Sequence, residues 1–80
     1  MNAQHKAIRA VISSMAPKRA ISYIRAFELQ AEEEACLIEC DVRGKSYIQA
    51  SESLHLSPEC VKRRRQRAFS KIADSINHSE

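Results

Sequence analysis

Helix breakers and large aromatic residues are scarce in this sequence: its 80 residues include one glycine, two prolines, two phenylalanines and no tryptophan. Apolar residues nevertheless make up 44% of the chain, which favours an ordered helical protein over a disordered one. The core must therefore be built mainly from Ile, Leu, Val and Ala. Because a chain this short hides only about 60% of its unfolded surface, residues 1–80 are predicted to form one small domain that a partner or a second copy supports.

A membrane segment and a secretion signal are also missing. No apolar run approaches the roughly 20 residues that span a bilayer, and the N-terminus has no continuous apolar stretch before a cleavage site. The three cysteines are an odd number without a disulfide framework, which fits a reducing compartment. The chain is therefore predicted to be cytoplasmic and not to bind a membrane.

Patterns typical of enzymes and metal sites are absent too. No side chains follow a nucleophile–base–orienter order, and no glycine-rich loop could hold a phosphate, so we expect neither an enzyme nor a cofactor. Four residues could in principle ligate zinc, namely Cys36, Cys40, His55 and Cys60. Their spacing is not that of a zinc finger or ribbon, and isolated cysteines are usually buried. We therefore expect no metal site.

Two helices are predicted in residues 3–28. In residues 3–15, apolar side chains recur at helical spacing. Those positions are Ile8, Val11, Ile12 and Met15. Pro17 interrupts this pattern and can begin a second helix over residues 17–28. Three roles stay open for these N-terminal helices: completing the core, forming a homodimer, or contacting another protein.

An acidic block without any cation follows the N-terminal helices. It consists of Glu28, Glu32, Glu33, Glu34, Glu39 and Asp41. Acids early in a helix are favoured by its dipole, so a third helix is predicted over residues 28–41, with Gly44 as its C-terminal cap. The acidic face is either a solvated surface or a patch that docks a basic partner, for example on RNA polymerase. It is not a nucleic-acid face, because it would repel phosphate.

The strongest signal lies in residues 58–72, where six cations accompany one acid. The local net charge is +5, in a chain whose total is +3. Ser57 is a good N-cap and Pro58 suits the first helical position. Its apolar stripe consists of Val61, Ala68, Phe69 and Ile72. With cations mostly on the opposite side, this predicted helix fits the major groove of DNA. Binding to a membrane surface is a secondary interpretation, because the apolar side of the helix lacks large residues.

A shorter helix precedes the basic one. Ser46 can cap a helix that ends near Leu54, and His55 and Leu56 form a short turn, with Leu56 directed toward the core. Helix, three-residue turn and helix form a helix-turn-helix arrangement. The fold is therefore predicted to be all-α, with four to five helices that include a helix-turn-helix, and with a polar tail over residues 73–80.

Residues 29–72 resemble region 4 of bacterial sigma factors and the related LuxR-type DNA-binding domain. The most specific piece is Gly44-Lys45-Ser46, a helix of small residues, and then a Leu-x-Leu-Ser run before Val61 and Lys62. Further matching positions are Leu29, Glu33, Leu37, Ile38, Ala50, Glu52, Arg64, Arg67, Ala68 and Ile72. The resemblance implies a helical domain that places its last long helix in the major groove and contacts RNA polymerase. It also implies a small transcription regulator of bacterial or phage origin.

The chain departs from that family pattern at a few positions: Ala50, Ser51, His55, Pro58 and Arg65. Arg65 stands where an apolar residue is usual. Two interpretations are open for Arg65: its side chain extends along the helix to a DNA phosphate, or the helix is slightly rotated.

Sequence-specific binding of double-stranded DNA in transcription regulation is the predicted function. Arg pairs with guanine, Gln with adenine and Glu with cytosine, so the predicted base or groove contacts are Glu59, Lys62, Arg63, Gln66 and Arg67. The predicted phosphate contacts are Lys45, Ser46, Tyr47, Ser57 and Arg64. The alternative is a protein-interaction module that binds RNA polymerase or another regulator, with weak or no specific DNA binding.

Overall fold

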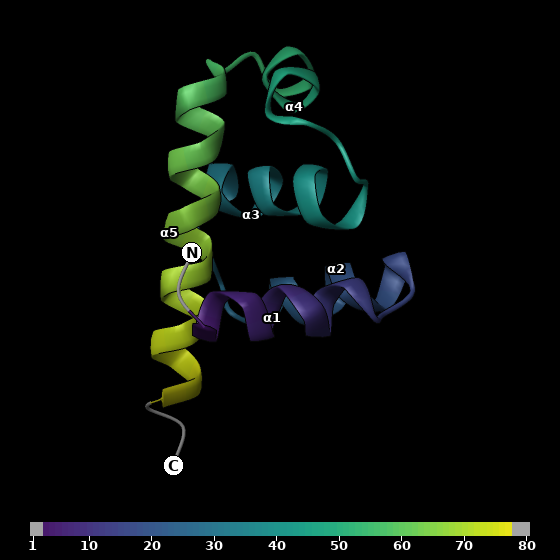
Figure 1. Cartoon of the computed structure of the whole chain (residues 1–80), viewed down its shortest axis with the longest axis vertical. Helices are drawn as coiled ribbons and strands as arrows, with labels where there is room; N and C mark the ends of the chain where they lie inside the picture. Colours follow the sequence, from purple (N-terminus) through teal and green to yellow (C-terminus); the bar gives the residue numbers. More distant parts are fainter. Residues whose placement is uncertain (1–2, 78–80) are drawn as a thin grey trace.

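The computed structural model describes residues 3–77 and is helical throughout (Figure 1). Its elements are α1 (Ala3–Ser13), α2 (Pro17–Arg25), α3 (Ala31–Leu37), a π-helical turn η1 (Ile38–Val42), α4 (Tyr47–Leu54) and α5 (Pro58–Asn77). No strand occurs in this part of the chain, so the all-α prediction is confirmed. In Figure 1, α5 runs along the long axis, α1, α2 and α3 lie across it on one side, and α4 lies beside its N-terminal end. None of the described helices is both long and apolar enough to cross a membrane.

The first two helices follow the predicted pattern with three corrections. The first helix ends at Ser13 and not at residue 15. Pro17 opens α2 as expected, and Ile8 and Ile12 are buried. Val11, however, is 43% exposed, so it lies beside the buried stripe and not within it. The second helix ends at Arg25 and not at residue 28. Glu28 adopts a left-handed backbone with φ of 54°, which is incompatible with a continuing helix.

The predicted third helix over residues 28–41 begins only at Ala31 and changes character before its end. Its start is set by Gln30, whose backbone N–H donates to Glu33 Oε1 at 3.2 Å. After Leu37 the chain widens into η1, where the Arg43 N–H donates to the Ile38 carbonyl at 3.0 Å. The helical segment ends at Val42, and Gly44 follows its C-cap Arg43 with a φ of +71° that favours glycine, as expected of a C-terminal cap.

Helix α4 and its connection to α5 match the prediction closely. Ser46 Oγ accepts from the Gln49 N–H at 3.1 Å, which is the predicted N-cap. His55 turns the chain with a left-handed φ of 58°. Leu56 then packs against a small core of Cys36, Ala50 and Val61. Three residues therefore join α4 to α5 and anchor the connection on apolar contacts.

Helix α5 supplies the centre of the main core. Its predicted stripe of Val61, Ala68, Phe69 and Ile72 is confirmed, since all four are 0% exposed. Around the lower part of that stripe lie Ile8 and Ile12 of α1, Ala20 and Ile24 of α2, and Leu37 of α3. Burying each large apolar side chain is worth about 1.5–3 kcal/mol, so the N-terminal helices help to form the core.

The predicted polar tail over residues 73–80 is wrong for its first half. Helix α5 continues to Asn77, and Ala73 is only 6% exposed because it lies four residues after Phe69 on the buried face. Gln4 Nε2 also donates to Asn77 Oδ1 at 3.0 Å, which ties the end of α5 to α1. Residues 78–80 of the predicted tail lie outside the described part of the chain.

Candidate nucleic-acid interface

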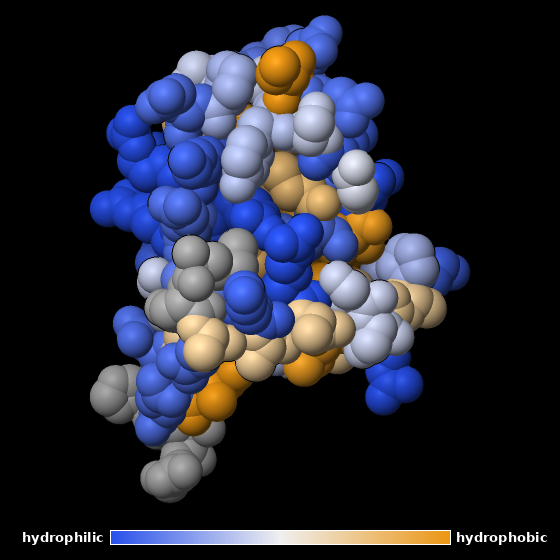
Figure 2. All heavy atoms as spheres, viewed as in Figure 1, coloured by the Kyte–Doolittle hydropathy of each residue, from blue (hydrophilic) through white to orange (hydrophobic). Residues whose placement is uncertain are grey.

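The five residues predicted to contact bases lie together on one exposed face of α5. Glu59, Lys62, Arg63, Gln66 and Arg67 recur at intervals of three and four residues, and each is exposed. Figure 2 shows strongly hydrophilic side chains gathered over the N-terminal half of α5. The five residues are called the basic face below. They point away from the core because Val61, Ala68 and Phe69 occupy the opposite side of the helix.

The cations of the basic face are not ion-paired within the described part of the chain. Among residues 3–77, no carboxylate forms an ion pair with Lys62, Arg63 or Arg67. Glu59, the single acid on the face, lies in the first turn, where the helix dipole favours it. The three cations are therefore available to an external anion.

The other cations of α5 are bound to the acidic block. Arg64 Nη2 lies 3.3 Å from Glu32 Oε1, Lys71 Nζ lies 2.7 Å from Glu33 Oε1, and Arg65 Nε lies 2.6 Å from Asp41 Oδ2. Glu34 and Glu39 pair with cations of other elements. Five of the six acids of the block thus form ion pairs within the domain, so most of the charge of the block is compensated internally.

Glu33 is the most deeply buried of these acids, with 1% of its surface exposed. Burial by itself raises the pKa of Glu33, but hydrogen bonds from Lys71 and the Gln30 N–H, together with the charges of Lys71 and Arg67, outweigh it and lower the pKa. Its second oxygen, Oε2, is buried without a hydrogen-bond partner among the described residues. The carboxylate is therefore held as an anion beneath α5.

The residues predicted to contact phosphate fall into two groups. Ser46 and Ser57 are exposed at the N-termini of α4 and α5, where each hydroxyl oxygen accepts a backbone N–H at 3.1 Å. Each hydroxyl proton remains available as a donor to a phosphate oxygen.

The other three predicted phosphate contacts are engaged inside the domain. Arg64 is paired with Glu32, as described above. Lys45 donates to Ser53 Oγ at 2.9 Å and lies 2.8 Å from Glu39 Oε2, an ion pair whose geometry is not that of a hydrogen bond. Tyr47 is half-buried, and its hydroxyl accepts from Arg65. For Lys45 and Arg64, phosphate contact would compete with an existing ion pair. The Tyr47 hydroxyl only accepts, so its proton remains available as a donor.

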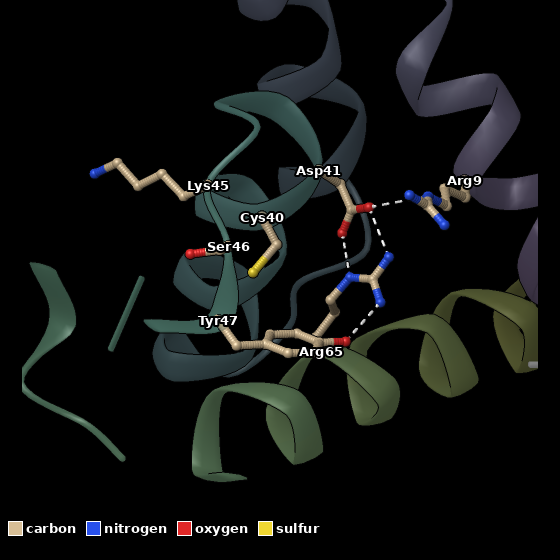
Figure 3. A pocket seen from close by; sticks show the side chains of 7 residues that line it. All are labelled: Arg9, Cys40, Asp41, Lys45, Ser46, Tyr47 and Arg65. Atoms are coloured by element: carbon tan, nitrogen blue, oxygen red, sulfur yellow. Dashed lines mark hydrogen bonds and ion pairs between the residues drawn. The ribbon is translucent and has the colours of Figure 1, made fainter. Parts of the chain in front are cut away.

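Arg65 is the main feature that sequence reasoning missed (Figure 3). Its side chain does not extend to the surface, as one interpretation of the sequence had it, but is 8% exposed. Nε and Nη2 donate to the two oxygens of Asp41 at 2.6 and 2.8 Å, and Nη1 donates to the Tyr47 hydroxyl at 3.1 Å. The guanidinium carbon also lies 4.8 Å from the centre of the Phe69 ring. The hydrogen bond to Asp41 raises the pKa of Arg65 further above its ordinary value, so the side chain stays charged.

An open pocket of about 350 Å³ lies beside this ion pair, between α1, η1 and the start of α4. Arg9 reaches it from α1, with its Nε 3.7 Å from Asp41 Oδ1. Figure 3 shows the Lys45 ammonium group and the Ser46 hydroxyl directed away from Asp41. Since Asp41 already has two cationic partners, the polar groups of the pocket mainly satisfy one another.

Of the three cysteines, Cys36 is buried, and Cys40 and Cys60 are half-buried. Burial raises the pKa of Cys36 to about 11, with smaller contributions from Cys40 and Cys60, and burial likewise raises the pKa of Cys40. A protonated thiol is a poor nucleophile and a poor metal ligand. Within residues 3–77, no group of three or more His, Cys, Asp or Glu side chains is placed to hold a metal ion.

The fold and the basic face define the chain as a small all-α domain with one exposed cationic helix face. Comparisons with protein-family models, with curated proteins and with solved structures find no match to this chain. The similarity to sigma-factor region 4 and to LuxR-type domains therefore rests on the sequence pattern alone, and a function has to be argued from the site.

Proposed function

We propose that this chain binds double-stranded DNA through the basic face of α5 and acts as a small transcription regulator. One observation carries the proposal: Lys62, Arg63 and Arg67 are exposed on one helix face, while five acids of the acidic block pair with other cations. Gln66 and Glu59 add readers of adenine and cytosine to the same face.

The arrangement of α4 and α5 supports insertion of α5 into the major groove, which admits one α-helix. The first turns of α5 carry the basic face, and α4 lies beside that end of the helix (Figure 1). The capping hydroxyls of Ser46 and Ser57 mark the two helix N-termini, where partial positive charge favours a phosphate. Together these features are consistent with a helix-turn-helix, in which phosphate contacts orient the recognition helix and that helix contacts the bases.

Selection from a random duplex library at two salt concentrations tests the proposal. A specific reader enriches one sequence motif at both salt concentrations, because base contacts persist when phosphate contacts are screened. Lys62, Arg63 and Arg67 changed together to Ala should abolish the enrichment. The matched control changes Lys6, Lys18 and Arg19 to Ala, which removes the same charge from exposed positions of α1 and α2.

Two results would contradict the proposal. Salt-sensitive binding without an enriched motif would leave only non-specific attraction to phosphate. An equal loss in the control variant would show that net charge, and not the basic face, drives binding.

The alternative, a module that binds RNA polymerase or another regulator, has weaker support in this molecule. Its docking surface was expected on the acidic block, whose acids pair mainly with cations of the same domain. The N-terminal helices were the other expected docking surface. Ile8, Ile12 and Ile24 are buried against α5 and α3, which supports a role for these helices in the core.

A further inference from the structure

Arg65 occupies a position where an apolar residue would serve stability equally well. It lies four residues after Val61 and four before Phe69, on the buried stripe of α5. Its partner Asp41 is also buried, with 4% of its side chain exposed. Removing two charges from water is unfavourable, and replacing a buried ion pair by apolar side chains of similar volume is often neutral or stabilising. Stability alone therefore does not account for this pair.

The hydrogen-bond geometry of the pair restricts the orientation of α5 relative to η1 and α4, which apolar packing would restrict less. The planar guanidinium meets both oxygens of Asp41 along one edge and the Tyr47 hydroxyl through Nη1. Asp41 belongs to η1 and Tyr47 is the first residue of α4, so one side chain of α5 is bound to two other elements (Figure 3). A bidentate contact between planar groups is satisfied in one orientation, whereas apolar side chains tolerate small rotations and shifts.

The neighbouring residues show why the orientation of α5 matters. Arg65 lies between Arg64 and Gln66, and Lys62 precedes it by one helical turn. A rotation of α5 about its axis would move every member of the basic face relative to Ser46 at the start of α4. Base contacts and phosphate contacts would then no longer fit one duplex together.

We propose that Arg65, through its contacts with Asp41 and Tyr47, is a positioning residue that fixes the rotation of α5 and its angle to α4. The consequence for DNA binding rests on the function proposed above. The orientation of α5 does not, because it can be measured without DNA.

The test replaces the pair by apolar side chains, Asp41→Leu with Arg65→Met, which leaves the net charge unchanged. Residual dipolar couplings of the backbone N–H groups report the direction of each helix in the weakly aligned, isotope-labelled protein. In the wild type, one alignment should fit α1, α3, α4 and α5 together. In the double variant, the couplings of α5 should shrink or disagree with that alignment, while the melting temperature stays within about 5 °C of the wild type.

The same proteins are titrated with the duplex that the wild type selects. Affinity of the double variant should fall about tenfold or more, the equivalent of one lost bidentate base contact. The matched control is Arg25→Met with Glu34→Leu, which removes an ion pair between α2 and α3 that is 3.8 Å long and involves no residue of α5. It should keep both the couplings and the affinity.

A second variant keeps the test decisive if the double variant does not fold. Arg65→Lys retains the buried charge beside Asp41 but cannot make the two-pronged contact, so it should also change the couplings of α5. Unchanged couplings in the folded variants would overturn the positioning role. If the wild type binds no specific duplex, the proposed function fails, and the couplings alone still decide the role of Arg65.

Discussion

Six cations lie on α5 between Pro58 and Ile72, and the fold divides them into two groups of three. Lys62, Arg63 and Arg67 point outward and form no ion pair within residues 3–77. The inner group consists of Arg64, Arg65 and Lys71, each bound to an acid of α3 or η1. Neighbours in sequence thus have opposite roles, one group holding the domain together and the other facing solvent. Counting the charge of a helix does not tell which of its cations are available for binding.

The largest difference in stability between the two groups of cations is expected at Arg65. Arg65→Ala leaves the Asp41 carboxylate buried with only the distant Arg9 as partner, and should destabilise the domain by about 3–5 kcal/mol. Arg63→Ala removes an exposed cation from the outer group and should change stability by less than about 0.5 kcal/mol. Urea unfolding of the two variants measures the contrast. Equal losses would mean that the two groups do not differ in structural role.

Glu33→Gln tests the structural role of the inner group through the pH dependence of stability. Because the pKa of Glu33 is lowered from 4.5 in the folded protein, its carboxylate stabilises the fold above that pH. The variant should be less stable than the wild type by about 1.5–3 kcal/mol at pH 7, the usual worth of hydrogen bonds to a charged group. As the pH falls through 4.5 and below the folded pKa, the unfolded chain binds the proton first, and the difference should vanish. Thermal unfolding between pH 7 and pH 3 measures this; a difference independent of pH would assign the effect to packing.

Local signals in the sequence were enough to predict most of the fold. Pro17, the Ser46 and Ser57 caps and the left-handed Gly44 act within one helical turn, so their neighbours determine the outcome. The end of α5 was predicted wrongly, although Ala73 continues the buried stripe four residues after Phe69.

Ion pairs between residues far apart in the sequence could not be predicted in the same way. Arg65 and Asp41 are 24 residues apart, and Lys71 and Glu33 are 38 apart. Nothing in their surroundings in sequence specifies these pairs. One clue was present, because Arg65 interrupts an apolar stripe while the acidic block contains no cation of its own. A buried cation and an unpaired acidic helix in one small domain indicate each other. The basic face, by contrast, could be predicted from the helical periodicity of α5 alone, because that periodicity determines which side chains share one face.

The outer group is tested by its effect on DNA. Arg63→Ala and Arg67→Ala should each weaken binding to the selected duplex by about 1–3 kcal/mol if the guanidinium contacts a base, with relaxed specificity at that position. Neither should change the melting temperature, which separates them from Arg65. Titrations on the selected duplex and on a scrambled one make the measurement. A uniform loss on both duplexes would show contact to phosphate only, and an unchanged affinity would remove the residue from the interface.

The smallest expected effect concerns Arg64, the member of the inner group whose acid partner is the most exposed. Its pairing with Glu32 is at the surface, with 29% and 52% of the two side chains exposed, so its loss should change stability by less than about 1 kcal/mol. Glu32→Gln releases Arg64 toward the solvent beside the basic face. DNA binding should then tighten slightly, and its dependence on salt should steepen by about one counterion if Arg64 reaches a phosphate. Glu34→Gln makes the same charge change next to Arg25, away from α5, and should leave the salt dependence as it is. If both variants steepen it equally, the gain comes from net charge, and Arg64 does not reach a phosphate.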